Sequence, residues 1–218
     1  MSAKLYWDTV TPLLKSILVQ LMDRDEFKQF RLVGGTALSL QIGHRLSVDI
    51  DLFTDATYDS INFDAIDDYL RRTFPYVTDS NPGPAALGKS YFIGNSEEEA
   101  IKLDLYYTEK FIQPEFKVNN IRMATIEEII AMKIDIVQRG GRKKDFWDLH
   151  ELIEKYSPEQ MIALHLQRYP YNHDETIIKS NFTNFSNADD DFEPNCLRGK
   201  YWEIVKLDIV EYIVNLRR

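Results

Sequence analysis

One segment, from Leu32 to Phe53, constrains the fold of this chain more than any other part of its sequence. An apolar run breaks at Gly34 and Gly35, resumes as an apolar-rich stretch, and ends in an alternating series that contains Asp49 and Asp51. Because successive side chains of a strand point to opposite faces, the two aspartates project from one face and the apolar residues beside them enter a core. We therefore predict a strand over residues 48–53 that carries two carboxylates on one face.

These two motifs also predict a chemistry. Carboxylates about 7 Å apart on one strand face repel each other, and an apolar setting strengthens the repulsion. A hard divalent cation such as Mg²⁺ or Mn²⁺ relieves it, because such cations take oxygen ligands. Gly34 and Gly35 let the backbone approach a phosphate closely and donate N–H groups, with a short helix expected over residues 36–42 behind them. Either motif alone is usually an ordinary turn or strand end, but together they indicate a metal-assisted nucleotide site.

The spacing of the motifs resembles a known signature. An apolar residue, Gly-Gly, thirteen residues and then Asp-apolar-Asp-apolar resemble the DNA polymerase beta-like nucleotidyltransferase superfamily. The longer motif, Gly34-Gly35-Thr36 followed by the series of residues 43–53, resembles that of the AbiEii/AbiGii toxin branch of minimal nucleotidyltransferases. The resemblance implies that Gly34, Gly35 and Thr36 hold the phosphates. Arg45 lies between this loop and the aspartates, where we expect it to contact the nucleotide.

Asp104 is the candidate third carboxylate. The alternating series of residues 100–107 predicts a strand in which Asp104 faces away from the apolar positions. An isolated aspartate there is most often a surface residue. By the resemblance, however, Asp104 completes a metal-binding triad with Asp49 and Asp51, which would hold two Mg²⁺ ions, and it helps to activate the acceptor hydroxyl.

A second group of charged residues spans residues 133–149. The series Lys133 and then Arg142-x-Lys144-Asp145-x-x-Asp148 resembles the downstream motif of the same family. A triphosphate carries more negative charge than the metals balance, so we expect Lys133 to face the aspartates across a cleft, with Arg142 or Lys144 near it. Asp145 is expected to hold that lysine or a substrate hydroxyl, and Asp148 to be structural. Without the upstream motif, such a mixture is most often an exposed, salt-bridged helix start.

The other patterns predict helices and strands in the first half and helices alone in the second. Capping residues such as Thr11 and Asn62, with apolar residues at helical spacing, mark the helices, and alternation marks the strands. Thr125 and Glu128 are expected to form a capping box. We predict helices over residues 8–22, 36–42, 63–74, 126–137, 143–156, from 157 onward and over 201–216, strands over 30–33, 48–53, 90–93 and 100–107, and loops over 81–88, 169–173 and 186–194.

This order of elements predicts an α+β fold. Residues 1–123 are expected to form a nucleotidyltransferase-type mixed sheet with helices, as the resemblance implies. Residues 124–218 are expected to form a helical half that completes the active-site cleft. A chain of 218 residues is long enough for one large domain or two small ones with a sizeable core.

Charge and composition exclude several classes of function. The net charge of −9 argues against broad, non-specific coating of nucleic acid, which needs a basic surface. No apolar run approaches the roughly 20 residues that cross a bilayer, and no signal peptide opens the chain. The lone Cys196 excludes an internal disulfide and suits a reducing compartment. We therefore expect a cytoplasmic protein with no membrane partner.

The resemblance implies a metal-dependent transfer of a nucleoside monophosphate from a nucleoside triphosphate to an acceptor hydroxyl. It also implies the toxin role of a bacterial toxin–antitoxin pair, with an antitoxin protein as partner and an RNA such as tRNA as the first choice of acceptor. Two alternatives stay open. One is a non-catalytic nucleotide-binding or interaction module with the same fold. The other is a haloacid-type phosphohydrolase, which the sequence favours least because that class needs Thr or Val where Phe53 stands.

Overall fold

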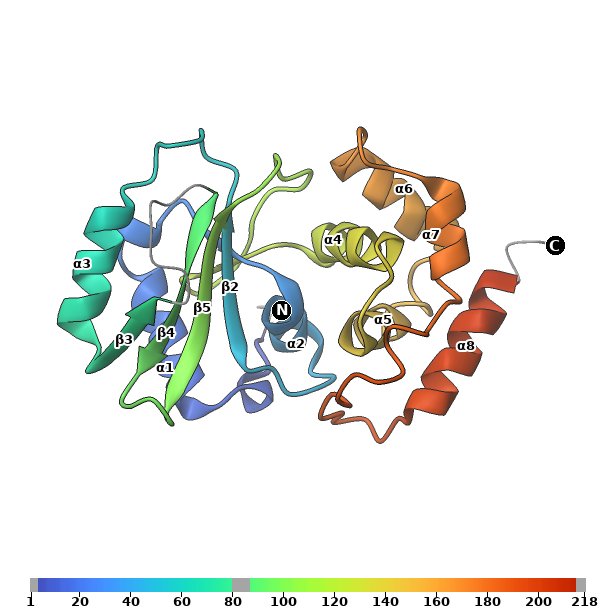
Figure 1. The fold of residues 1–218 in the computed structure, drawn as a ribbon, viewed down its shortest axis with the longest axis horizontal. Coiled ribbons are helices and arrows are strands. Elements are labelled where there is room, and N and C mark those ends of the chain that lie inside the picture. The colour runs from blue at the N-terminus through green and yellow to red at the C-terminus, as the bar shows by residue number, and fades with distance from the viewer. Residues whose placement is uncertain (1–3, 80–86, 215–218) are drawn as a thin grey trace.

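A mixed β-sheet forms the centre of the first half of the chain (Figure 1). The computed structural model describes residues 4–79 and 87–214. Within these ranges seven strands lie side by side. In spatial order they are β3 (Tyr76–Asp79), β4 (Gly88–Gly94), β5 (Ala100–Tyr107), β2 (Asp49–Thr54), β1 (Arg31–Leu32), β7 (Ile121–Met123) and β6 (Phe116–Val118).

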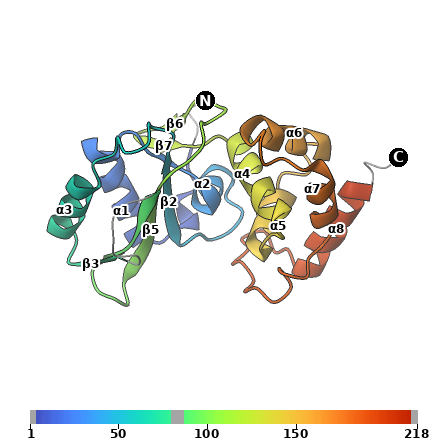
Figure 2. The same ribbon diagram turned by 45° about the horizontal axis from the view of Figure 1, so that its top comes forward.

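Helices cover both faces of this sheet. Helices α1 (Pro12–Met22) and α3 (Phe63–Thr73) lie on one face, and α2 (Gly34–Ile42) lies on the other (Figures 1 and 2). The side chains of Ile50 and Leu52 are fully buried, whereas those of Asp49 and Asp51 are only partly buried. The expected alternation is therefore confirmed from Asp49 onward, but Val48 precedes the strand and is 61% exposed, so its predicted place in the core is wrong.

The second half of the described chain is helical. Helices α4 (Ile126–Gln138) and α5 (Lys143–His150) pack against α2, so that α2 lies between the sheet and the helical half (Figure 1). Helix α6 (Pro158–Arg168) packs on α4, and α8 (Trp202–Val214) packs on α5. The short α7 (Glu175–Asn181) also contacts α4. This arrangement confirms the predicted mixed sheet followed by helices.

Most helix starts follow from local chemistry. The side chain of Thr11 accepts a hydrogen bond from Leu14 N and Pro12 takes the first helical position, while Asn62 caps α3 in the same way. The expected capping box at α4 is only half formed. Thr125 accepts from Glu128 N, but the Glu128 carboxylate is buried and pairs with Arg168 instead. A buried partner from α6 thus displaces the local one.

Several boundaries and short elements differ from the sequence prediction. Helix α2 begins at the glycines and not at residue 36, and α5 ends at His150, followed by turns, where the pattern suggested a helix to residue 156. Four elements were not predicted from the sequence, because they are short and lack strong periodicity: β3, β6, β7 and α7. Of the predicted loop 81–88, residues 81–86 lie outside the described residues, and β4 begins at Gly88.

The register of the central strands decides which side chains meet. Strands β2 and β5 are parallel, and Asp51 is the direct neighbour of Asp104 while Asp49 is the neighbour of Lys102. Neighbouring residues in register share a sheet face. The three aspartates therefore project from the face that α2 covers in part. No helix among the described residues is long and apolar enough to cross a membrane.

Candidate active site

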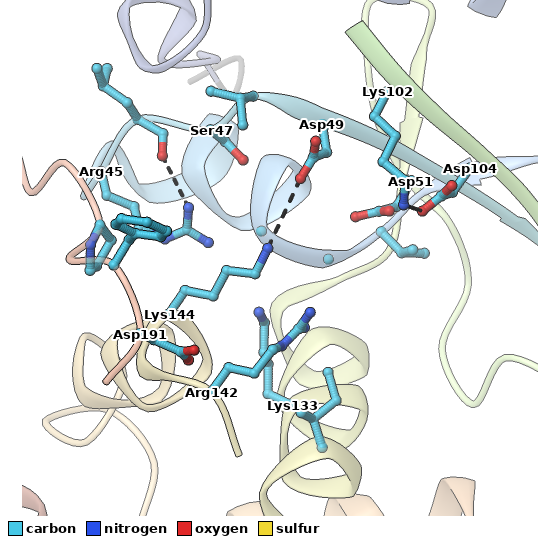
Figure 3. Close-up of a pocket in the computed structure, with 18 of the residues that line it drawn as sticks. Arg45, Ser47, Asp49, Asp51, Lys102, Asp104, Lys133, Arg142, Lys144 and Asp191 are labelled. Carbon is cyan, nitrogen blue, oxygen red and sulfur yellow. Dashed lines mark hydrogen bonds and ion pairs between the residues drawn. The ribbon is translucent and has the colours of Figure 1, made fainter. Parts of the chain in front are cut away.

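A cavity of about 650 Å³ lies where β2, β5 and α2 face α4 and α5 (Figure 3). Its size is within the range of cavities that bind small molecules. One side, the sheet wall, carries the aspartates of β2 and β5, and the opposite side, the helical wall, carries cations of α4 and α5. The lining includes most of the residues selected from the sequence, namely Gly34, Gly35, Arg45, Asp49, Asp51, Asp104, Lys133, Arg142 and Lys144.

The sheet wall holds three carboxylates and one cation. Asp49, Asp51 and Asp104 lie along the same face, as Figure 3 shows. The ammonium of Lys102 donates to Asp104 Oδ2 at 2.6 Å. The other oxygen, Asp104 Oδ1, is buried and has no hydrogen-bond partner within the part of the chain that the structure describes. One buried carboxylate oxygen in this wall therefore has no hydrogen bond to replace its contacts with water.

Burial and neighbouring charges act together on Asp51. Burial first, and then the charges of Asp104 and Asp49, raise the pKa of Asp51 from 3.8 to about 6. Lys133 and Lys144 oppose this shift without cancelling it. Near neutral pH the sheet wall therefore holds more negative charge than its cations balance, and a bound cation would relieve that repulsion.

The helical wall supplies three cations. Lys133 comes from α4, and Arg142 and Lys144 lie at the start of α5 (Figure 3). Lys144 Nζ stands 4.0 Å from Asp49 Oδ2, and this ion pair joins the two walls. Burial, and then the charges of Arg142 and Lys133, lower the pKa of Lys144. These cations repel one another, and an anion between them would relieve that repulsion.

A buried layer of ion pairs supports the helical wall. The side chain of Lys133 is 5% exposed, and its ammonium lies 2.6 Å from Asp145 Oδ1 and 2.7 Å from Asp148 Oδ2. Arg142 Nε donates to Asp145 Oδ2 at 2.7 Å. Burial would raise the pKa of Asp145, but Lys133 and Arg142 hold it below its ordinary value. An ammonium has three N–H bonds, so two carboxylates leave one for a ligand in the cavity.

Asp148 connects this layer to the first half of the chain. It is fully buried, and Arg45 donates from Nε to Oδ1 at 2.6 Å and from Nη2 to Oδ2 at 2.9 Å. His44 Nε2 donates to Oδ1 at 2.7 Å. Burial would raise the pKa of Asp148, but Lys133 and Arg45 hold it well below its usual value. The structural role expected for Asp148, binding neighbouring basic groups, is confirmed.

The two glycines leave space for side chains of the site. At Gly34 the backbone has φ +67°, which favours glycine, and an added Cβ would lie 2.7 Å from Asp51 Oδ2. At Gly35 an added Cβ would lie 2.3 Å from Arg45 Nη2. The Gly-Gly pair therefore admits Asp51 and Arg45 as well as lining the cavity with backbone.

Thr36 and Asp145 do not line the cavity. The Thr36 hydroxyl is buried, donates to the backbone oxygen of Asp49 and lies 2.8 Å from the Ser47 hydroxyl, so it ties α2 to the start of β2. The hydroxyl is therefore engaged with the protein itself, and the expected contact of Thr36 with phosphate stays a prediction. Asp145 is fully buried and reaches the cavity only through Lys133 and Arg142, in agreement with the expectation that it holds the lysine.

Two parts of the lining were not anticipated from the sequence. Lys102 alternates with Asp104 on one strand, and this spacing already places both on one face. Residues 191–194 belong to the predicted loop 186–194, and together with Asn195 they line the cavity. No local pattern shows that this loop meets a strand so far away in the sequence. An aromatic residue among acidic ones, Phe192, is the one unusual feature of that loop.

The sheet wall fits a divalent cation in its chemistry. Among the described residues no three His, Cys, Asp or Glu side chains are gathered in the arrangement of a metal site, and Asp104 is paired with Lys102. The available donors are nonetheless carboxylate oxygens, which Mg²⁺ and Mn²⁺ prefer. The unpartnered Oδ1 of Asp104 and the raised pKa of Asp51 both indicate a place where a cation would be stabilised.

Comparisons with known proteins identify the family of this chain. The family described as nucleotidyl transferase AbiEii toxin, type IV TA system, matches residues 16–206. An uncharacterized protein of Aquifex aeolicus (strain VF5) is 30% identical over 200 residues, covering 85% of this chain and 89% of that protein.

Solved structures share the fold at low sequence identity. A putative nucleotidyltransferase from H. pylori has a TM-score of 0.58 at 18% identity, and the match covers 93% of this chain and 91% of that one. MenT4, a nucleotidyltransferase toxin from Mycobacterium tuberculosis H37Rv, has a TM-score of 0.56 at 12% identity, covering 92% of this chain and 79% of that one. Because the family match spans both walls of the cavity, the chain belongs to the AbiEii nucleotidyl transferase toxin family.

Proposed function

We propose that this chain is a metal-dependent nucleotidyltransferase that moves a nucleoside monophosphate from a nucleoside triphosphate to an acceptor hydroxyl. One observation carries the proposal. In a single cavity, the three aspartates of the sheet wall face the three cations of the helical wall (Figure 3). In a metal-bound triphosphate, the positive metal complements the aspartates of the sheet wall and the negative phosphates complement the cations of the helical wall.

Asp49, Asp51 and Asp104 are the residues that would hold Mg²⁺ or Mn²⁺. When bound, such a cation neutralises charge on the phosphoryl oxygens that the reaction generates. Asp104 would offer the cation its Oδ1, which has no hydrogen-bond partner among the described residues, because Oδ2 already accepts from Lys102. Lys102 also lines the cavity and adds a further positive charge to it.

The helical wall would bind the phosphates. Lys133 offers its remaining N–H, held in place by two carboxylates behind it. Arg142 and Lys144 add a guanidinium and an ammonium from the next helix. Charged hydrogen bonds of this kind are about twice as strong as neutral ones. Positioning by these groups and stabilisation of charge supply most of the catalysis in phosphoryl transfer.

The acceptor that we propose to test first is RNA, tRNA included, because of the sequence resemblance described above. With a net charge of −9 the chain attracts RNA poorly as a whole, so contacts would concentrate near the cations of the cavity. We also propose an antitoxin protein as partner, since the matched family is described as part of a type IV toxin–antitoxin system.

Labelled-nucleotide transfer tests the proposed function. The purified chain is incubated with α-³²P-labelled nucleoside triphosphates, Mg²⁺ and total RNA, and label in RNA is measured against release of pyrophosphate. We expect Asp49→Asn to reduce transfer by at least two orders of magnitude. Asp68→Asn, an exposed position on α3, serves as the matched control. Nucleotide binding without transfer to any acceptor would favour the non-catalytic module, and release of phosphate alone would favour a hydrolase.

A further inference from the structure

Part of the cavity lining, here called the apolar end, offers neither carboxylates for a metal nor cations for phosphates. Phe192 is 100% exposed, Val48 is 61% exposed and Leu46 is 38% exposed, and all three line the cavity together with Pro194. Exposed apolar side chains are common one at a time, but a group of them inside a charged cavity calls for an apolar ligand. This end adjoins Asp49, which follows Val48 directly in the chain.

The loop that carries Phe192 is anchored firmly on its N-terminal side. Lys143 is buried, and its ammonium donates to the backbone oxygens of Asp191 at 2.6 Å and of Asp189 at 3.1 Å. The Lys143 backbone N–H donates to Asp191 Oδ2 at 2.9 Å, so that this carboxylate satisfies a free N–H at the start of α5. The side chain of Asp189 in turn accepts from Trp202 Nε1 at 2.7 Å.

The C-terminal side of the loop is anchored to the segment that precedes β2. Leu46 N donates to the backbone oxygen of Asn195 at 2.9 Å, and Leu197 N donates to that of His44, also at 2.9 Å. Arg45 and Cys196 form an isolated antiparallel bridge between these bonds. Phe192 and its two successors therefore form a short arch between two fixed points, and proline at position 194 stiffens it.

We propose that Phe192 is the stacking platform for the base of the nucleoside triphosphate, with Val48 and Leu46 completing the apolar contact. This inference rests on the proposed function. A fully exposed phenyl ring on an anchored arch leaves apolar surface in water, and a planar base can cover that surface. Because the arch is already ordered, stacking would cost little conformational entropy.

The charges of the cavity favour a nucleotide over an apolar partner. An apolar peptide that covered Phe192 alone would leave the cations of the helical wall without an anion. A nucleoside triphosphate joins an aromatic base to a triphosphate in one molecule, so it matches both the apolar end and Lys133, Arg142 and Lys144. The acceptor base and a protein partner are therefore the competing occupants that an experiment must separate.

Binding measurements on three chains test the proposal. Wild type, Phe192→Ala and Phe192→Trp are titrated with each of the four ribonucleoside triphosphates and with inorganic tripolyphosphate, all with Mg²⁺, by calorimetry. Loss of one aromatic–base stack is expected to weaken nucleotide binding by roughly 5- to 150-fold in Phe192→Ala. Tripolyphosphate binding should stay within about twofold, and Phe192→Trp should bind nucleotide like wild type, with its added indole fluorescence quenched by nucleotide but not by tripolyphosphate. Thermal unfolding of Phe192→Ala should match wild type, because the ring is exposed.

Each other outcome overturns the inference in a distinguishable way. Equal weakening for nucleotide and tripolyphosphate would show that Phe192 only shapes the loop. Unchanged nucleotide binding with reduced transfer would place the acceptor base, and not the nucleotide base, on the ring. Unchanged binding and transfer would leave the proposed function standing and remove the platform. A wild-type chain that binds no nucleoside triphosphate would overturn both.

Discussion

Replacing Asp51 by asparagine should stabilise the metal-free protein while abolishing the proposed nucleotide transfer. In the folded protein the pKa of this carboxyl group is raised from 3.8 to about 6, by burial and then by Asp104 and Asp49. The folded state thus binds the proton more tightly than the unfolded chain does, so wild-type stability falls as pH rises between those two values. Asparagine carries no charge at any pH and does not incur this loss.

The magnitude follows from the shift in pKa. One pKa unit corresponds to about 1.4 kcal/mol, so a shift of roughly two units predicts that Asp51→Asn is more stable than wild type by about 3 kcal/mol at pH 7.5. The difference should shrink steadily below pH 6 and nearly vanish near pH 4. Such a gain in stability with a loss of activity is expected where charged groups are held together for function at a cost in stability.

Urea unfolding at several pH values, with a chelator present, measures this difference. Asp68→Asn, whose side chain is 68% exposed, should change stability by less than about 0.5 kcal/mol at every pH. Adding Mg²⁺ should then raise the stability of wild type but not that of Asp51→Asn, because only the ionised triad binds the cation. Equal stability of wild type and Asp51→Asn at pH 7.5, or a gain that does not depend on pH, would refute the electrostatic account.

Three further substitutions probe the layers around the cavity. Lys133→Ala should lower the unfolding free energy by about 3–5 kcal/mol in urea titrations, because two buried carboxylates lose their shared cation. A loss below about 1 kcal/mol would contradict the stabilising role of these buried ion pairs. Gly35→Ala should cost about 1–3 kcal/mol in the same assay, since its Cβ must displace the Arg45 guanidinium, and wild-type stability would show that this contact yields freely. Lys102→Ala should tighten Mg²⁺ binding several-fold in calorimetry by freeing Asp104 Oδ2, whereas weaker binding would mean that the lysine supports the site.

Local pattern predicted the orientation of the three aspartates, but not their neighbourhood. Alternation along residues 48–53 placed Asp49 and Asp51 on one face and turned Asp104 away from the apolar positions of its own strand, because a period of two is fixed by strand geometry. The place of Asp104 beside Asp51 was expected only from the family resemblance. The capping residues Thr11 and Asn62 were likewise readable, since a cap involves only neighbours in the sequence.

Contacts between segments far apart in the sequence could not be predicted from local sequence patterns. Glu128 looked like the partner of its own helix start, but Arg168 reaches it from α6 and provides a buried countercharge. Thr36 looked like a phosphate contact, but its hydroxyl is taken by the backbone of Asp49. The loop that carries Phe192 faces the cavity only because Lys143 and the segment after His44 hold it there. In each case a partner far away in the sequence determines the contacts of the side chain, and local sequence propensity carries no information about that partner.

Asp148 lies later in the chain than the residues that it binds. Its partners His44 and Arg45 come from the segment before β2, and Lys133 comes from α4, so all three are synthesised before their shared carboxylate. A growing chain that ends before α5 already contains every aspartate of the sheet wall, but the guanidinium of Arg45 has no carboxylate to bind. The helical wall and the arch of Phe192 are also still missing at that stage. We therefore expect the proposed chemistry to require α5 and the loop that carries Phe192, and a chain truncated before α5 to be inactive.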